Sequence, residues 1–247
     1  MAEVKRGAAL VTGGARRIGH ALVLACADAG FDVAIHCRTI DDEAEAAAAA
    51  VRSKGRKATL LAGDLRHEAA NVALVSGAET ELGPVTLLVN SASLFEDDDF
   101  YTMSRASWHA HMEVNLRAPL VLSQAFARRL PADRQGLIVN ILDQRVWRPT
   151  PHFFSYAISK AALWEATRMM AQALAPKIRV NAVGPGPTLA SIHQDADGFA
   201  REAQGTLMGR PVDPVEIGQA LRYLIDAKSV TGQMIAVDAG QHLAWRA

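Results

Sequence analysis

The sequence has few of the features that mark a disulfide scaffold, a membrane protein or a charged binding surface. Its 247 residues include only two cysteines, Cys26 and Cys37, and neither lies in a metal-ligand spacing. Basic and acidic residues both number 26, so the charge balance gives no reason to expect a nucleic-acid or membrane-surface partner. No apolar run is long enough to span a bilayer, and no signal-peptide pattern is present. We therefore expect a cytoplasmic protein with reduced thiols, no nucleic-acid partner and no membrane contact.

Short aliphatic runs alternate with longer helical patterns, and half of the residues are hydrophobic. Strands are predicted at residues 8–11, 33–36, 58–61, 87–89, 137–142, 177–183 and 233–237. Helices are predicted at residues 18–29, 42–53, 69–82, 107–130 and 155–174. This alternation indicates parallel strands joined by right-handed crossovers. We predict one α/β domain over residues 1–247, a Rossmann-type doubly wound fold with a seven-stranded parallel sheet flanked by helices on both faces. The irregular, polar residues 188–210 are expected to form a surface excursion.

A glycine-rich turn, TGGARRIG, follows the first predicted strand at residues 12–19. Gly13 and Gly19 permit a tight turn, and the helix that begins at Ile18 offers unpaired N–H groups to a pyrophosphate. Arg16 and Arg17 add cationic donors where the phosphates of a nucleotide would lie. Glycine-rich turns are common, so it is the position of this one between the first strand and the first helix that indicates a dinucleotide site.

The end of the second predicted strand indicates which nicotinamide cofactor is used. An NAD site usually carries an acid there, which binds the 2′-hydroxyl of the ribose. Here the strand is followed by Arg38 and Thr39, which suit a 2′-phosphate. Asp41 and Asp42 come soon after, but they are better placed to cap the next helix. We therefore predict NADPH as the cofactor.

Asp143, Tyr156 and Lys160 are the candidate catalytic residues. Tyr156 and Lys160 are spaced i, i+4, so on a helix they project from one face. A lysine ammonium beside a phenol favours the phenolate, so we expect Lys160 to lower the pKa of Tyr156. Asp143 ends an apolar strand, at the edge where open α/β sheets bind ligands. The alternative is an exposed Tyr/Lys pair on an ordinary helix, with Asp143 only ending a strand.

Together these motifs resemble the short-chain dehydrogenase/reductase family along essentially the whole chain. The resemblance implies that the cofactor is lined by residues that follow several strands: Asp64 and Leu65 beside the adenine, Asn90, Ser91 and Ala92, and Pro185 and Gly186 near the nicotinamide. It also implies that Asn115 helps to position a water linked to Lys160, and that Lys160 holds the nicotinamide ribose. A homotetramer is the implied assembly.

Two positions depart from the usual pattern of the family. Arg17 stands where most members have a glycine, and Asp143 stands where most have a serine. Both departures are similar to the pteridine reductase and dihydromonapterin reductase branch, in which an aromatic at the position of Phe95 stacks on the pterin. An aromatic residue there would equally suit core or loop packing. A carboxylate beside Tyr156 would repel a developing alkoxide, whereas it can exchange protons or hydrogen bonds with the nitrogens of a pterin.

The remaining polar residues show no metal-ligand pattern, and we predict no metal. The acidic run at residues 96–99 is expected to be solvated, and the eight histidines lack a ligand spacing. Trp147, His152, Phe153 and Phe154 are expected either to line the substrate pocket or to pack against a neighbouring subunit. Residues 188–210 suit either a mobile substrate lid or an inert loop.

The resulting hypothesis is an NADPH-dependent oxidoreductase that transfers hydride to a pteridine and converts a dihydropterin to the tetrahydro form. Arg17, Phe95, Asp143 and Tyr156 would bind the substrate, and Tyr156 and Asp143 would handle protons. One alternative is an NADPH-dependent carbonyl reductase such as a 3-oxoacyl-acyl carrier protein reductase. The other is a non-catalytic NADP-binding scaffold or sensor, against which the intact Tyr156 and Lys160 argue.

Overall fold

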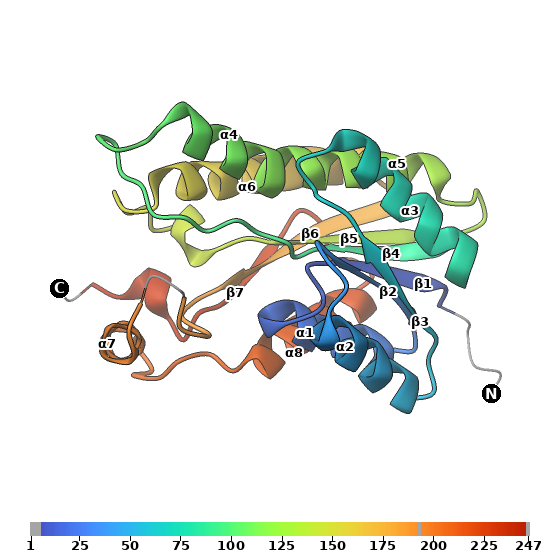
Figure 1. Cartoon of the computed structure of the whole chain (residues 1–247), viewed down its shortest axis with the longest axis horizontal. Helices are drawn as coiled ribbons and strands as arrows, with labels where there is room; N and C mark the ends of the chain where they lie inside the picture. The colour runs from blue at the N-terminus through green and yellow to red at the C-terminus, as the bar shows by residue number, and fades with distance from the viewer. Residues whose placement is uncertain (1–5, 192–193, 246–247) are drawn as a thin grey trace.

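Within residues 6–191 and 194–245, which the computed structural model describes, seven parallel strands form one sheet (Figure 1). The strands are β1 (Ala8–Thr12), β2 (Asp32–Cys37), β3 (Ala58–Ala62), β4 (Val85–Asn90), β5 (Gly136–Ile141), β6 (Ile178–Pro185) and β7 (Met234–Val237). Their order is β3-β2-β1-β4-β5-β6-β7, which confirms the predicted sheet. The chain changes direction across the sheet between β1 and β4, and ligands of such sheets bind beyond the carboxyl ends of the strands at that point.

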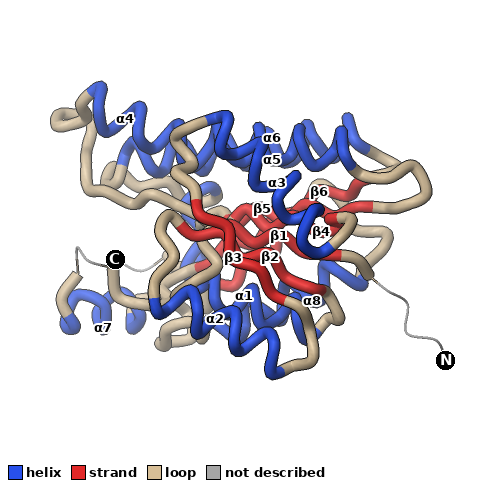
Figure 2. The backbone as a smooth tube through the Cα atoms, turned by 45° about the vertical axis from the view of Figure 1, so that its right-hand side comes forward, coloured by secondary structure: helices blue, strands red, loops and turns tan. Residues whose placement is uncertain are grey.

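Helices cover both faces of the sheet, so the predicted doubly wound architecture is also confirmed (Figure 2). One face packs against α1 (Arg17–Asp28), α2 (Asp42–Ser53) and α8 (Pro214–Asp226). The other packs against α3 (Glu68–Leu82), α5 (Ala118–Arg129) and α6 (Phe154–Leu174), with α4 (Arg105–Met112) beside α6. Because both faces are covered, β1, β4 and β5 are buried at every position. The result is a rigid support for the residues that follow the strands.

The predicted helix over residues 107–130 is interrupted in the structure. A π-helical segment, Glu113–Arg117, separates α4 from α5. Single π-helical turns inside helices often lie at functional sites. Here the segment carries Asn115, whose side chain is fully buried.

Two further helices were not predicted. Residues 188–210, expected to be irregular, contain α7 (Ala196–Gln204), which begins after the N-cap Asp195. The second is α8, where Asp213 and Glu216 form a capping box around Pro214. The sequence carries this signal as Asp-Pro-Val-Glu, so α8 was recognisable in principle. Helix α7 was not recognised because it is short and lies in a polar stretch whose composition is typical of a loop.

Some predicted boundaries lie outside the described residues. These are the ends of the predicted domain, at residues 1–5 and 246–247, and residues 192–193 of the predicted excursion. A single domain over residues 1–247 therefore stays a prediction.

Candidate active site

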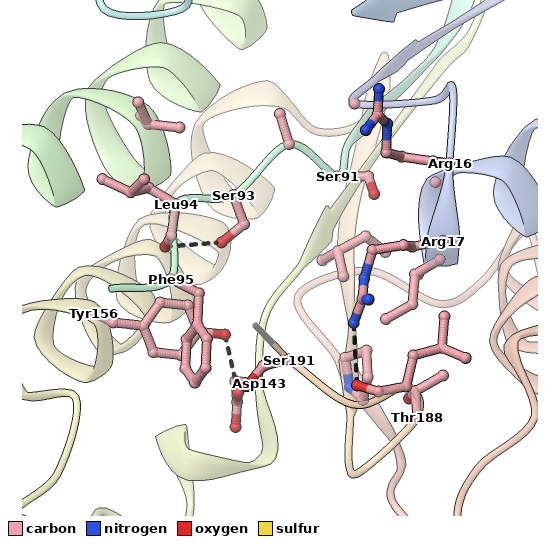
Figure 3. Close-up of a pocket in the computed structure, with 18 of the residues that line it drawn as sticks. Arg16, Arg17, Ser91, Ser93, Leu94, Phe95, Asp143, Tyr156, Thr188 and Ser191 are labelled. Carbon is pink, nitrogen blue, oxygen red and sulfur yellow. Dashed lines mark hydrogen bonds between the residues drawn. The ribbon is translucent and has the colours of Figure 1, made fainter. Parts of the chain in front are cut away.

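A cavity of about 840 Å³ lies beyond the carboxyl ends of the central strands. Most of the predicted site residues line it, including Asp143, Tyr156 and Lys160 at one part and the glycine turn at another. Figure 3 shows the side chains of Phe95, Tyr156 and Asp143 on one side and those of Arg16 and Arg17 on the other. Most of the predicted cofactor and substrate residues therefore line one cavity.

The glycine turn is shaped by close backbone contacts. Gly13 has a φ of +63°, and a Cβ added to it would lie 2.9 Å from Cα of Ala92. A Cβ on Gly19 would lie 1.9 Å from the carbonyl oxygen of Gly13. Only glycine fits at either position, so the turn keeps backbone N–H groups close to the cavity. The fit for a pyrophosphate at the start of α1 is therefore good.

His36, which the sequence did not single out, holds this turn in place. Its Nδ1 accepts a hydrogen bond of 3.2 Å from the Gly13 N–H, and its Nε2 lies 3.0 Å from the Gly63 carbonyl oxygen. These partners require a neutral ring that donates from Nε2. Burial lowers the pKa of His36, in agreement with that neutral form.

The segment after β4 is fixed by Thr12, whose Oγ1 accepts hydrogen bonds from the N–H groups of Ser91 and Ala92. Ser91 and Ala92 line the cavity as expected. Asn90 does not: its side chain is 2% exposed and donates a 2.8 Å hydrogen bond to Oδ1 of Asn140. The side chain of Asn90 therefore lies inside the sheet and ties β4 to β5, and its implied place beside the cofactor stays a prediction.

The residues after β2 occupy the positions expected of them. Arg38 and Thr39 are exposed and line the cavity. Asp41 is the N-cap of α2 and accepts a hydrogen bond from the N–H of Ala44. Arg16 forms ion pairs with Asp41 and with Glu43. Arg38 and Asp41 both line the cavity, but Asp41 is occupied as the cap of α2 and as the ion-pair partner of Arg16.

Asp64 and Leu65 line the cavity after β3, as the resemblance implied. The carboxylate of Asp64 accepts hydrogen bonds from the guanidinium and the backbone N–H of Arg66. These bonds hold the pKa of Asp64 well below its usual range. Asp64 is therefore an anionic acceptor at neutral pH.

The three candidate catalytic side chains converge. Tyr156 Oη donates a 2.9 Å hydrogen bond to Oδ2 of Asp143, shown as a dashed line in Figure 3. Nζ of Lys160 donates to the Ile141 carbonyl oxygen at 2.9 Å and lies 5.7 Å from the centroid of the Tyr156 ring. Because Tyr156 and Lys160 are buried, the alternative of an exposed pair on an ordinary helix is excluded.

The predicted effect of Lys160 on the phenol pKa is not found. Burial and the neighbouring Asp143 carboxylate raise the pKa of Tyr156 well above its usual value. Burial also lowers the pKa of Lys160 to about 8, opposed by the charge of Asp143. The sequence-based prediction considered the ammonium alone and neglected the closer carboxylate and the loss of solvent.

Phe95 lines the cavity next to Tyr156, with ring centroids 4.7 Å apart in an edge-to-face arrangement. One face of its ring stacks on Phe153, with centroids 4.1 Å apart and planes 15° apart. A substrate ring that stacked on Phe95 would therefore use the opposite face. Phe153 lines the cavity, but Trp147, His152 and Phe154 do not. Trp147 packs edge-to-face on His242, and Phe154 packs edge-to-face on Phe100.

Arg145 was missed by the sequence analysis. It follows Asp143 by two residues, in a 3₁₀ turn (Gln144–Val146), and lines the cavity. Its Nη1 lies 3.2 Å from Oδ2 of Asp143, and its backbone N–H donates to Oδ1 at 2.8 Å. A lone arginine after a strand carries no local signal of such a role.

Among the described residues, the side chain of Asn115 forms hydrogen bonds with Ser93, Leu94 and Ser159, and none with Lys160. Its amide accepts from the Leu94 N–H at 2.7 Å, donates to the Leu94 carbonyl at 2.9 Å and donates to Oγ of Ser159 at 3.1 Å. It therefore fixes the backbone immediately before Phe95. Its implied role in a water relay stays a prediction.

Arg17 contacts the segment after β6. Its Nη2 donates to the carbonyl oxygens of Leu189 and Ala190, both at 3.0 Å. Its φ of 54° is left-handed, which explains why glycine is usual at this position in the resembled family. Pro185 and Gly186 line the cavity at the end of β6, as implied.

The acidic run is not uniformly solvated. Asp98 is 5% exposed, and its carboxylate accepts hydrogen bonds from the Ser155 N–H at 2.9 Å and from Ser107 Oγ at 2.6 Å. The expectation of a solvated run is therefore wrong at Asp98, which binds the first turn of α6. No group of His, Cys, Asp or Glu residues suited to a metal ion occurs among residues 6–191 and 194–245.

The model of the short chain dehydrogenase family matches residues 7–198, which span the glycine turn and the Tyr156–Lys160 pair. The chain belongs to this family of oxidoreductases, which confirms the resemblance. It is 34% identical to the 3-oxoacyl-[acyl-carrier-protein] reductase FabG of Aggregatibacter actinomycetemcomitans, over 94% of this chain and 97% of that protein. It is 32% identical to the uncharacterized oxidoreductase YghA of Escherichia coli, over 98% and 84%.

Two solved structures are more similar. FolM alternative dihydrofolate reductase 1 from Brucella canis, complexed with NADP, is 48% identical with a TM-score of 0.94, over 99% of this chain and 97% of that chain. The protein of the same description from Brucella suis, also with NADP, is 47% identical with a TM-score of 0.95, over 99% and 98%. In the described part of this chain, no helix has the length and apolarity needed to cross a bilayer.

Proposed function

We propose that this protein is an NADPH-dependent pteridine reductase that converts a dihydropterin to the tetrahydro form. The observation that carries the proposal is the 2.9 Å hydrogen bond from Tyr156 to the carboxylate of Asp143, inside a cavity that Arg17 and Phe95 also line. A carboxylate at this position opposes the negative charge that a ketone acquires on reduction. It suits a substrate with ring nitrogens and an amino group.

The cavity fits NADPH. The glycine turn offers N–H groups to a pyrophosphate, and Arg38 and Thr39 offer donors to a 2′-phosphate. When bound, the cofactor would supply the hydride. The Brucella structures contain NADP, and a 30% identical blue fluorescent protein from a metagenomic library contains NADPH. Comparing kcat/KM for NADPH and NADH tests this part, and Arg38→Ala should reduce the preference for NADPH by about 10- to 100-fold. Arg52→Ala, away from the cavity, is the matched control.

Different side chains of the protein would hold the proton, the cofactor and the substrate. Tyr156 holds a proton at Oη, and Asp143 accepts the hydrogen bond from it, so the pair places a proton beside a substrate nitrogen. Lys160 would hold the nicotinamide ribose, and Asn115 fixes the segment that carries Phe95. Phe95 would lie against the pterin ring, and Arg17 would bind its polar edge or the pyrophosphate.

The similarity to the two FolM proteins over nearly their whole length supports a pteridine substrate. The similarity to FabG supports the rival carbonyl reductase, although that substrate class does not explain the acid at position 143. The test is NADPH oxidation with dihydrobiopterin, dihydromonapterin, dihydrofolate and an acetoacetyl thioester. Turnover of the thioester without any pteridine would select the carbonyl reductase, and no turnover at all would select the non-catalytic scaffold.

A homotetramer and a cytoplasmic location complete the proposal. Family membership supports the assembly. Light scattering coupled to gel filtration measures the assembly, and a monomeric mass at micromolar concentration would contradict it.

A further inference from the structure

Arg145 is a mostly buried cation in the substrate part of the cavity, and the proposed mechanism does not use it. Its side chain is 18% exposed, and it lies two residues after Asp143. A cation that loses much of its hydration requires compensation from nearby groups. The contacts of Arg145 show which groups provide it.

The first group is the carboxylate of Asp143. Oδ1 accepts from the backbone N–H of Arg145, and Oδ2 accepts from both Nη1 of Arg145 and Oη of Tyr156. An ionised carboxylate offers about four lone-pair sites, so three are used and one remains. Because arginine has only donors, this arrangement requires Asp143 to be an acceptor.

The second group is the aromatic pair formed by Phe95 and Phe153. The guanidinium carbon lies 5.6 Å from the centroid of Phe95 and 5.5 Å from that of Phe153, within the range of cation–π attraction. Phe153 has a left-handed backbone, with a φ of 54°, which residues other than glycine seldom adopt. The ring of Phe153 is thus placed against Phe95 at a cost in backbone strain.

The Nε atom of Arg145 is closed off from solvent and makes no hydrogen bond with the residues that the structure describes. A buried donor without an acceptor destabilises the fold, so the position of Arg145 is not explained by stability alone. Since Nε cannot reach a substrate, the contacts of the guanidinium with Asp143, Phe95 and Phe153 are what explain its position.

We propose that Arg145 is a positioning residue that determines substrate specificity: it holds Asp143 as a charged acceptor for a substrate N–H group and fixes the Phe95–Phe153 pair beside a flat nitrogen heterocycle. The inference rests on the proposed function and sharpens it. Tyr156 then carries the proton for the substrate, whereas Asp143 recognises an N–H or amino group through its remaining lone pair.

The test compares Arg145→Met and Arg145→Lys with Arg148→Met. Arg148 is exposed, donates to the Gln241 carbonyl and does not line the cavity, so its variant is the matched control. For Arg145→Met, the KM for a dihydropterin should rise about 10- to 100-fold, with a smaller change in the KM for NADPH.

Arg145→Lys should not restore the KM for the pterin, because lysine keeps the charge but not the planar guanidinium. Calorimetric titration of pterin into the NADP⁺-loaded protein provides a readout without turnover, and melting temperatures show whether each variant is folded. If Arg145→Met does not fold, the raised KM of Arg145→Lys for the pterin, compared with its KM for NADPH, carries the test. A wild-type protein that reduces pterins, with Arg145 variants indistinguishable from Arg148→Met, overturns the role of Arg145 alone. A wild-type protein that neither binds nor reduces pterins overturns the proposed function and this inference together.

Discussion

The hydroxyl of Tyr156 donates its hydrogen bond to the carboxylate of Asp143, and both side chains belong to the wall of one cavity. An acid beside the tyrosine makes the phenol harder to ionise, since burial and the carboxylate both raise its pKa. The carboxylate opposes the negative charge of a developing alkoxide beside the tyrosine. It does not oppose a substrate nitrogen that takes up a proton from the tyrosine.

Replacing Asp143 by serine tests this relationship most directly. In Asp143→Ser, kcat/KM for a dihydropterin should fall by about 10²–10⁴-fold, because a positioned partner of the proton is lost. Turnover of an acetoacetyl thioester should rise, because serine donates a hydrogen bond to the developing oxyanion. Tyr156→Phe, the companion variant, should lose both activities. Unchanged pterin reduction in Asp143→Ser would show that the carboxylate has no part in the reaction.

The pH dependence on the alkaline side should report Lys160. Burial lowers the pKa of its ammonium to about 8, so the cation is present below that pH and is lost as the pH rises through it. We expect kcat/KM of the free enzyme to fall above about pH 8. Lys160→Arg should be less active but should lack this limb, because the guanidinium stays charged. A wild-type profile that is flat up to pH 10 would contradict the prediction.

Arg17 combines a strained backbone with a functional side chain, and two substitutions separate them. Arg17→Gly and Arg17→Ala both remove the hydrogen bonds to Leu189 and Ala190. Only glycine relieves the left-handed φ of 54°, so Arg17→Gly should be more stable than Arg17→Ala by about 1 kcal/mol. Both should show the same loss of pterin kcat/KM. Urea unfolding and steady-state kinetics measure the two effects, and equal stability of the two variants would argue against strain.

Asp98 and its exposed neighbour Asp97 form a matched pair. Asp98→Ala should destabilise the protein by about 1–2 kcal/mol, because the Ser155 N–H in the first turn of α6 loses its acceptor. Asp97→Ala should change stability little, since that side chain is exposed. Equal unfolding free energies for the two variants would show that Asp98 does not stabilise the start of α6.

The same carboxylate has a pH signature. Although burial opposes it, hydrogen bonds from Ser107 and Ser155 lower the pKa of Asp98 below the usual 3.8. Its contribution is therefore fully present above pH 3.8 and is lost as the pH falls through the lowered value. The difference in stability between the wild type and Asp98→Ala should shrink in that acidic range.

The features that could be predicted from the sequence are those set by residues close to one another along the chain. The glycine turn and the spacing of Tyr156 and Lys160 are local patterns, and so is the place of Asp143 just after the apolar run of β5. Each could be placed relative to the sheet because strands and helices alternate regularly along the chain. Arg38 was likewise identified from its distance along the chain from the turn.

What escaped prediction depends on contacts between distant segments. The role of Arg145 appears only when Phe95, fifty residues earlier in the chain, packs beside it. Asp98 is one of four consecutive acidic residues, and only the meeting of α4 and α6 buries it. The raised pKa of Tyr156 also arises from burial, which the spacing of two residues on a helix does not encode.

Asp143 has an ordinary extended backbone, with φ −155° and ψ 149°, two residues after the last residue of β5. Almost any amino acid can take that conformation, and the strand before it is held by its neighbours in the sheet. Substrate choice at this position is thus separable from folding. After duplication of such a gene, two nucleotide changes in a single codon are enough to exchange the aspartate for a serine, which gives selection a short route between nitrogen heterocycles and carbonyl compounds.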